Sequence, residues 1–150
     1  IASITGTNFS GFYNQSEGTA FVDATPDEVV NATNICSFSD GTFSNRHQFY
    51  AETNFYFLRT GASGSASGNT LGAAVANTKA KVAFSFANGS NFGSLNGGSV
   101  TTNTQTLPLT ISELNLGSSP AGDVTNAMHL SRLSYWNDRL SNDYLTKLTS

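Results

Sequence analysis

The chain contains little sulfur, little proline and little charge. Of its 150 residues one is cysteine, three are proline and 11% are charged. A single cysteine excludes an intramolecular disulfide framework and a zinc site built from several thiolates. The net charge of −3 provides no basic field that could attract phosphates, so the composition argues against nucleic-acid binding.

Long apolar segments are also missing. The longest mostly apolar run, residues 82–86, is far too short to span a bilayer, so we expect no membrane insertion. Residues 1–10 have neither the positive charges nor the apolar stretch of a signal peptide. The first residue is Ile1 and not methionine, from which we expect a processed product or a fragment of a longer protein.

Small polar residues are abundant instead. The chain has 20 Ser, 18 Thr, 16 Asn and 14 Gly, residue types that favour turns and strands over long helices. Asn-Gly and Asp-Gly pairs, which accept the positive φ of hairpin turns, recur between short aromatic and β-branched runs. This pattern predicts strands at residues 19–24, 34–39, 46–52, 55–60, 79–87, 90–95, 99–102, 111–116 and 128–136.

The alternation of side chains along two of these strands predicts which of their faces are buried. Val82, Phe84 and Phe86 fall on one face of the strand at 79–87, so we expect that strand to have one buried side. Strict alternation over residues 128–136 places Leu130 and Trp136 on one face and Leu133 on the other. Large apolar groups on both faces indicate a strand that is partly buried on each side.

One helix is expected, at residues 142–148. Ser141 can cap its N-terminus, Asp143 suits the positive end of the helix dipole and Lys147 suits the negative end. Two turns of helix are marginal alone, so an apolar stripe containing Leu145 must dock on the sheet.

The stretch at residues 61–69, GASGSASGN, contains no side chain large enough to pack. We expect a flexible loop here, inside a single domain that spans residues 1–150, because two separate halves would each be too short for a core. About ten short strands in one domain predict an all-β sandwich or barrel.

Catalytic constellations are not apparent. The ten acidic residues are scattered, and no two of them alternate along a strand as a pair of glycosidase carboxylates would. Cys36 lies in an apolar strand and is interpreted as a buried small hydrophobe. His47 and His129 are far apart and lack any metal-binding spacing. We therefore predict no catalytic residues and no enzymatic activity.

A metal or cofactor has equally little support. No D-x-D run is present, and the loop residues Asp40, Asp123 and Asn126 are only weak candidates for a calcium site. We expect no cofactor, with calcium as the one open alternative.

Sugar binding is the chemistry that remains. Aromatic faces cover the C–H surfaces of sugars, while amides, hydroxyls and charged groups meet their polar groups. Tyrosine and tryptophan suit a binding surface better than phenylalanine does. The alternative for each of them is a ring packed inside the domain, with only its polar tip at the protein surface. The glycan-binding candidates are Arg46, Tyr50, Tyr56, Arg59 and Trp136.

Two terminal stretches resemble a known family. Residues 2–19, ASITGTNFSGFYNQSEGT, and residues 129–142, HLSRLSYWNDRLSN, are similar to the opening and closing segments of a concanavalin A-like (laminin-G-like) domain of tailed-phage and prophage appendage proteins. The segments FSDGT at 38–42 and FGSLNGG at 92–98 occupy fitting places between them.

The resemblance implies a two-sheet antiparallel jelly roll, a concanavalin A-like β-sandwich, with one short C-terminal helix. It implies a non-catalytic domain at the virion surface, in a tail fibre, tailspike or head fibre, that recognises a host polysaccharide or glycan. Its partners would include other phage structural proteins, and such domains are often homotrimers. In this family's closing segment Trp136 is expected to pack the last strand against the helix. The alternative function is a structural capsid or appendage module that serves assembly or oligomerisation and binds no glycan.

Overall fold

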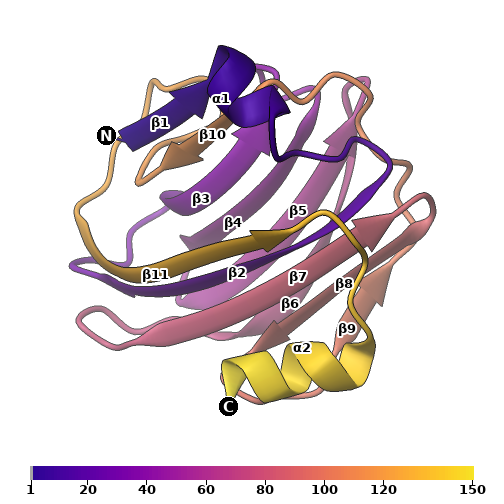
Figure 1. Ribbon diagram of the computed structural model, residues 1–150. Coiled ribbons are helices and arrows are strands. Elements are labelled where there is room, and N and C mark those ends of the chain that lie inside the picture. The colour runs from indigo at the N-terminus through magenta and orange to yellow at the C-terminus, as the bar shows by residue number, and fades with distance from the viewer. Residues whose placement is uncertain (1) are drawn as a thin grey trace.

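Two antiparallel sheets face each other in the structure, a computed structural model that describes residues 2–150 (Figure 1). Ile1, on which the expectation of a fragment rests, lies outside the described residues. The six-stranded sheet has the order β1 (Ala2–Thr5), β10 (Glu113–Leu116), β3 (Thr33–Ser39), β4 (Arg46–Glu52), β5 (Phe55–Ala62) and β6 (Ser65–Ala73). The five-stranded sheet has the order β11 (Met128–Trp136), β2 (Glu17–Pro26), β7 (Ala80–Ala87), β8 (Ser90–Leu95) and β9 (Thr101–Asn103).

Two short helices complete the fold. The expected C-terminal helix is present as α2 (Asn142–Thr149), and a second helix that was not expected, α1 (Gly6–Ser10), follows β1. Neither helix in the described part of the chain is long and apolar enough to cross a membrane. The prediction of an all-β, two-sheet antiparallel sandwich with a short C-terminal helix is confirmed.

The core lies between the sheets and consists largely of aromatic rings. Phe38 of β3 meets Phe84 of β7 edge to face, with 5.9 Å between ring centroids. His47 of β4 stacks on Phe86 of β7 at 4.3 Å. Such ring pairs stabilise the fold by more than the burial of their apolar area, and they pack the two sheets against each other. Cys36 is buried in the same core, as expected, and burial raises the pKa of its thiol.

His47 is the buried ionisable ring of this core. Its Nδ1 lies 3.2 Å from Thr60 Oγ1, and the side chain is almost completely buried. Because the charged imidazolium would lose its hydration, burial lowers the pKa of His47 from 6.5 to about 3. The ring is therefore neutral at physiological pH.

Both faces of β7 are buried, which corrects the expectation of one buried side. Val82, Phe84 and Phe86 face the central core as predicted. The opposite face is covered as well, because Ala83 packs in a second cluster with Phe21 and Leu145 under α2.

Strand β11 departs from strict alternation. Its register against β2 shifts between Leu130 and Arg132, so Ser131 is an additional residue in the strand. Leu130 and Leu133 consequently pack against the same central core, although alternation had placed them on opposite faces. Trp136 lies on the outer face, in the cluster under α2.

The stretch at 61–69 is a hairpin and not the expected loop. It contains the end of β5, a turn at Ser63-Gly64 and the first half of β6, which pairs with β5 along its length. Ser63 and Gly64 have φ values of 51° and 83°, as a two-residue type I′ turn requires. Strand β6 forms an edge of the sheet and is mostly exposed, so backbone hydrogen bonds and not side-chain burial hold it in place.

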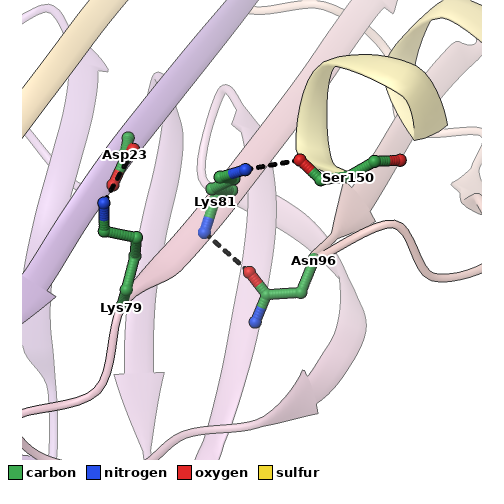
Figure 2. Close-up of polar contacts among 5 residues, drawn as sticks. All are labelled: Asp23, Lys79, Lys81, Asn96 and Ser150. Atoms are coloured by element: carbon green, nitrogen blue, oxygen red, sulfur yellow. Dashed lines mark hydrogen bonds and ion pairs between the residues drawn. The ribbon is translucent and has the colours of Figure 1, made fainter.

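Helix α2 is fixed to the outer face of the five-stranded sheet. Ser141 Oγ accepts a hydrogen bond from the backbone N–H of Tyr144, the cap that the sequence predicts. At the other end Lys81 Nζ donates to the carbonyl oxygen of Ser150, and the Lys81 backbone N–H donates to Asn96 Oδ1 at 2.8 Å (Figure 2). The neighbouring Lys79–Asp23 ion pair, at 3.6 Å, is the only one among residues 2–150 (Figure 2).

Candidate functional site

The outer face of the six-stranded sheet is unusually polar. Along β4 the side chains of Arg46, Gln48 and Tyr50 point outward, because His47 and Phe49 between them face the core. Strand β5 pairs with β4 so that Gln48 lies opposite Arg59, and the same face continues across both strands. The pleat therefore brings together three of the five predicted binding residues, Arg46, Tyr50 and Arg59.

Arg46 is 7% exposed, yet it has no acidic partner among the residues that the structure describes. Its Nε donates to Gln48 Oε1 at 3.0 Å, and its Cζ lies 5.4 Å from the centroid of the Phe43 ring. Gln48 in turn donates to Asn34 Oδ1. Burial lowers the pKa of the Arg46 guanidinium, and the nearby positive charge of Arg59 lowers it further.

Arg59 and Tyr50 form the second half of this face. The Arg59 Cζ lies 5.3 Å from the Tyr50 ring centroid, and the Tyr50 ring stacks on Phe57 at 5.6 Å. Tyr50 is 3% exposed, and its hydroxyl has no hydrogen-bond partner among residues 2–150. Burial raises the pKa of Tyr50, an effect that Arg59 opposes and Glu52 reinforces. We call the five side chains Arg46, Gln48, Tyr50, Phe57 and Arg59 the arginine face.

A glycine leaves space for one of the two guanidinium groups. A Cβ added to Gly61, the β5 partner of Arg46, would come 3.2 Å from Arg46 Nη1, closer than an ordinary contact. A Cβ on Gly68, the β6 partner of Arg59, would lie 3.7 Å from Arg59 Nε, which is ordinary van der Waals contact. Gly61 therefore lets the Arg46 side chain lie along the sheet.

The arginine face is walled on one side and open on the other. On the β3 side the segment 117–126 folds over the sheet: Ser39 Oγ donates to the carbonyl oxygen of Pro120 at 3.1 Å, and the Asn34 N–H donates to Asn126 Oδ1 at 2.7 Å. On the β6 side the outward residues are small and exposed, including Gly68 and Thr70. The arginine face is therefore less covered toward the free β6 edge than toward β3.

The other two predicted binding residues lie elsewhere. Tyr56 is 2% exposed and belongs to the central core, where its ring lies 5.3 Å from that of Phe49. Because β5 alternates, Tyr56 faces inward and offers no ring face to a ligand. Trp136 is half-buried against α2 on the opposite sheet, as the family resemblance implies, and does not contribute to the arginine face.

The calcium candidates are engaged in local hydrogen bonds. The Asp40 carboxylate accepts from Thr42 and Asn45, and Asp123 accepts from Ser119. Asn126 Oδ1 accepts from the backbone of Asn34. Residues 2–150 contain no cluster of three His, Cys, Asp or Glu side chains that could hold a metal ion. The calcium site stays a prediction.

Sequence reasoning missed two members of the arginine face, Gln48 and Phe57, and the neighbouring Phe43. Gln48 orients Arg46, Phe43 covers it, and Phe57 supports Tyr50. The signal for Gln48 was present, because alternation along RHQFYAE puts it between Arg46 and Tyr50 on one face. Alternation along FYFLRT likewise puts Phe57 on the face of Arg59, whereas Phe43 lies outside the predicted strands and carried no such signal.

The comparisons with known proteins show the fold. No family model and no curated protein matches the sequence. Among solved structures the chain is similar to the CBM40 module of the Ruminococcus gnavus IT-sialidase bound to α2,3-sialyllactose, with 17% identity, a TM-score of 0.75 and coverage of 91% of this chain and 84% of that one. The same module has also been solved with α2,6-sialyllactose, again at a TM-score of 0.75.

The chain also matches larger sialidases. NanB sialidase from Streptococcus pneumoniae is 13% identical, with a TM-score of 0.76. The match covers 99% of this chain but only 27% of NanB. The leech intramolecular trans-sialidase, solved with 2,7-anhydro-Neu5Ac, is 11% identical over 91% of this chain and 23% of its own, with a TM-score of 0.73. The sandwich is thus a fold used by modules and domains of sialidases.

Proposed function

We propose that this protein is a carbohydrate-binding domain, and that the arginine face holds the carboxylate of an acidic sugar. The observation that carries the proposal is the pair Arg46 and Arg59, two guanidinium groups on one sheet face with no acidic partner among the described residues. Similarity in fold to a module that was solved with sialyllactose supports the choice of an acidic sugar.

The energetics of Arg46 favour an anionic ligand. A guanidinium that is mostly removed from water loses hydration, and one hydrogen bond to Gln48 does not replace it. A carboxylate offers two oxygens in the geometry that guanidinium donors match, and such charge-assisted bonds are stronger than neutral ones. Binding an anion also removes the repulsion between Arg46 and Arg59.

The Phe57 ring suits the neutral part of a sugar. It is half-buried, whereas the Tyr50 hydroxyl is fully buried, so a C–H surface of the sugar would meet Phe57. The open edge at β6 gives a glycan room to leave the site, whereas the segment 117–126 closes the opposite side.

We propose binding without hydrolysis. Two carboxylates that flank the arginine face are Glu52, at the far end of β4, and Glu113, which aligns with Arg46 through Ser39. Glu52 is six positions further along β4 than Arg46, so Glu52 and Glu113 lie about 20 Å apart. Glycosidase pairs are separated by less than about 10 Å, and this arrangement therefore does not supply one.

Calorimetric titration with 3′-sialyllactose and with lactose tests the proposal. We expect the protein to bind sialyllactose and to bind lactose far more weakly, because lactose has no carboxylate. Arg46→Gln and Arg59→Gln should each weaken binding about ten- to a hundredfold, the effect of losing hydrogen bonds to a charged group. Arg132→Gln, on the opposite sheet, is the matched control and should bind normally. Equal binding by all variants, or no binding by the parent, would refute the proposal.

The setting of this activity is proposed from the sequence resemblance. We propose that the domain belongs to a phage appendage, lies on the virion surface and binds a host polysaccharide, with other phage structural proteins and two further copies of itself as partners. Residues 2–19 and 129–142 support this proposal. Added purified protein should then compete with phage for adsorption to the host, and light scattering should give a trimer mass. A protein that leaves adsorption unchanged would contradict the host-recognition role.

A further inference from the structure

The arginine face continues along β5 into a row of aromatic side chains. Outward positions on this strand are occupied in turn by Gly61, Arg59, Phe57 and Phe55. Successive outward residues of a strand are about 7 Å apart, so Phe57 and Phe55 form a line that leads away from Arg59. Phe57 is half-buried and Phe55 is 47% exposed.

The exposure of Phe55 has no structural explanation in the sandwich. Its backbone pairs with Glu52 and Ala73, and the turn at Thr53-Asn54 beside it already has the positive φ values, 48° and 70°, that a tight hairpin needs. A polar residue would serve equally well at this position, since the side chain is absent from both apolar clusters of the core.

The neighbours of Phe57 and Phe55 leave both rings accessible from the sheet edge. Across β6 they face Thr70 and Ala73, which are small and exposed. On the β4 side the Tyr50 ring stacks on Phe57 and holds it in position. The result is an aromatic row with one open flank, next to the proposed carboxylate site, in which Phe57 is held by Tyr50.

We propose that Phe57 and Phe55 form a second subsite, which binds the neutral sugars that follow the acidic sugar of a glycan. This inference rests on the proposed function, since the acidic sugar determines where the glycan starts. Aromatic side chains cover the C–H surfaces of neutral sugars, and the two rings continue from Arg59 along β5, with the small exposed residues of β6 on their open flank. The preferred ligand is accordingly an acidic oligosaccharide of at least three sugars, and not the acidic monosaccharide alone.

The test compares 3′-sialyllactose with the methyl glycoside of sialic acid, using calorimetry on the whole chain. The parent should bind sialyllactose about three- to tenfold more tightly than the methyl glycoside, the gain that one or two aromatic contacts provide. Phe55→Ala should remove most of this gain and leave the affinity for the methyl glycoside unchanged. Phe55→Leu, which keeps apolar area without a flat ring, should retain part of the gain.

Tyr144→Ala is the matched control, because Tyr144 is an aromatic residue of similar exposure, 48%, on α2 at the opposite sheet. It should bind both ligands like the parent, and thermal melts should show that each variant is folded. Equal affinity of the parent for the two ligands would overturn the second subsite while leaving the carboxylate site intact. An equal loss of affinity for both ligands in Phe55→Ala would overturn it as well. If Phe55→Ala instead changed the oligomer mass and left both affinities unchanged, the ring would be assigned to self-association. A parent that binds neither ligand would refute the proposed function, and the second subsite with it.

Discussion

His47 makes the stability of the sandwich depend on pH in a range where few side chains titrate. The ring is enclosed between the sheets against Phe86, and burial lowers its pKa from 6.5 to about 3. In the unfolded chain the imidazole takes up a proton near pH 6.5, whereas the native ring does not until the pH is near 3. The unfolded state therefore binds more protons between these values, and the free energy of unfolding decreases as the pH falls through that window.

The size of the effect follows from the two pKa values. Each pKa unit corresponds to about 1.4 kcal/mol. The loss between pH 7 and pH 5 is therefore about 2 kcal/mol, and the full loss, reached only below pH 3, is about 5 kcal/mol. Asp40 does not add to the pH dependence of stability between pH 7 and pH 5. Burial raises its pKa, hydrogen bonds from Thr42, Asn45 and Thr110 lower it, and the net result is below 3.8. Its contribution is present above that pH and is lost only as the pH falls further.

Urea unfolding at pH 7, 6 and 5, followed by the fluorescence of the single tryptophan, measures this dependence. The parent should lose about 2 kcal/mol over the range. In His47→Gln the free energy of unfolding should be nearly independent of pH over this range, whatever its absolute value. His129→Gln, which alters an exposed histidine, should show the same pH dependence as the parent. Identical slopes in all three proteins would show that His47 is not buried in the neutral form.

The remaining predictions concern packing and capping. Phe84→Ala should lower the free energy of unfolding by about 3–5 kcal/mol, because it opens a cavity between the sheets, and an unchanged melting temperature would place Phe84 outside the core. Ser141→Ala should cost about 1 kcal/mol, since the Tyr144 N–H at the start of α2 loses its side-chain acceptor; urea midpoints check this value, and no change would contradict the cap. The Cys36 thiol should react with a maleimide only under conditions that unfold the chain, and rapid labelling of the native protein would contradict its burial.

Much of the sandwich was predictable because large side chains mark it. Phe84 and Phe86 in β7 alternate clearly, and the strand at 46–52 was expected with the bounds that β4 has. Strand β6 gave no such signal, because an exposed edge strand of Ser, Ala and Gly is held by its backbone and shows no apolar period. Burial of the outer face of β7 could not be read from β7 itself, since it depends on where α2 docks.

The candidate site was partly predictable for the same reason. Arg46 and Tyr50 share a face by alternation within one strand, but their approach to Arg59 depends on how β4 and β5 are paired. A two-residue turn at Thr53-Asn54 sets that register, and it also places Tyr56 opposite Ala51 and toward the core. The inward orientation of Tyr56 therefore follows from a two-residue turn between the strands predicted at 46–52 and 55–60. The wall formed by residues 117–126 depends instead on contacts between segments far apart in the chain.

The most direct test of the account is a crystal structure of this protein with 3′-sialyllactose. We predict that the sugar carboxylate lies within hydrogen-bond distance of both Arg46 and Arg59, with the glycan extending along β5 over Phe57 and Phe55. A saccharide bound instead beside α2 and Trp136, on the opposite sheet, would contradict the assignment of the arginine face.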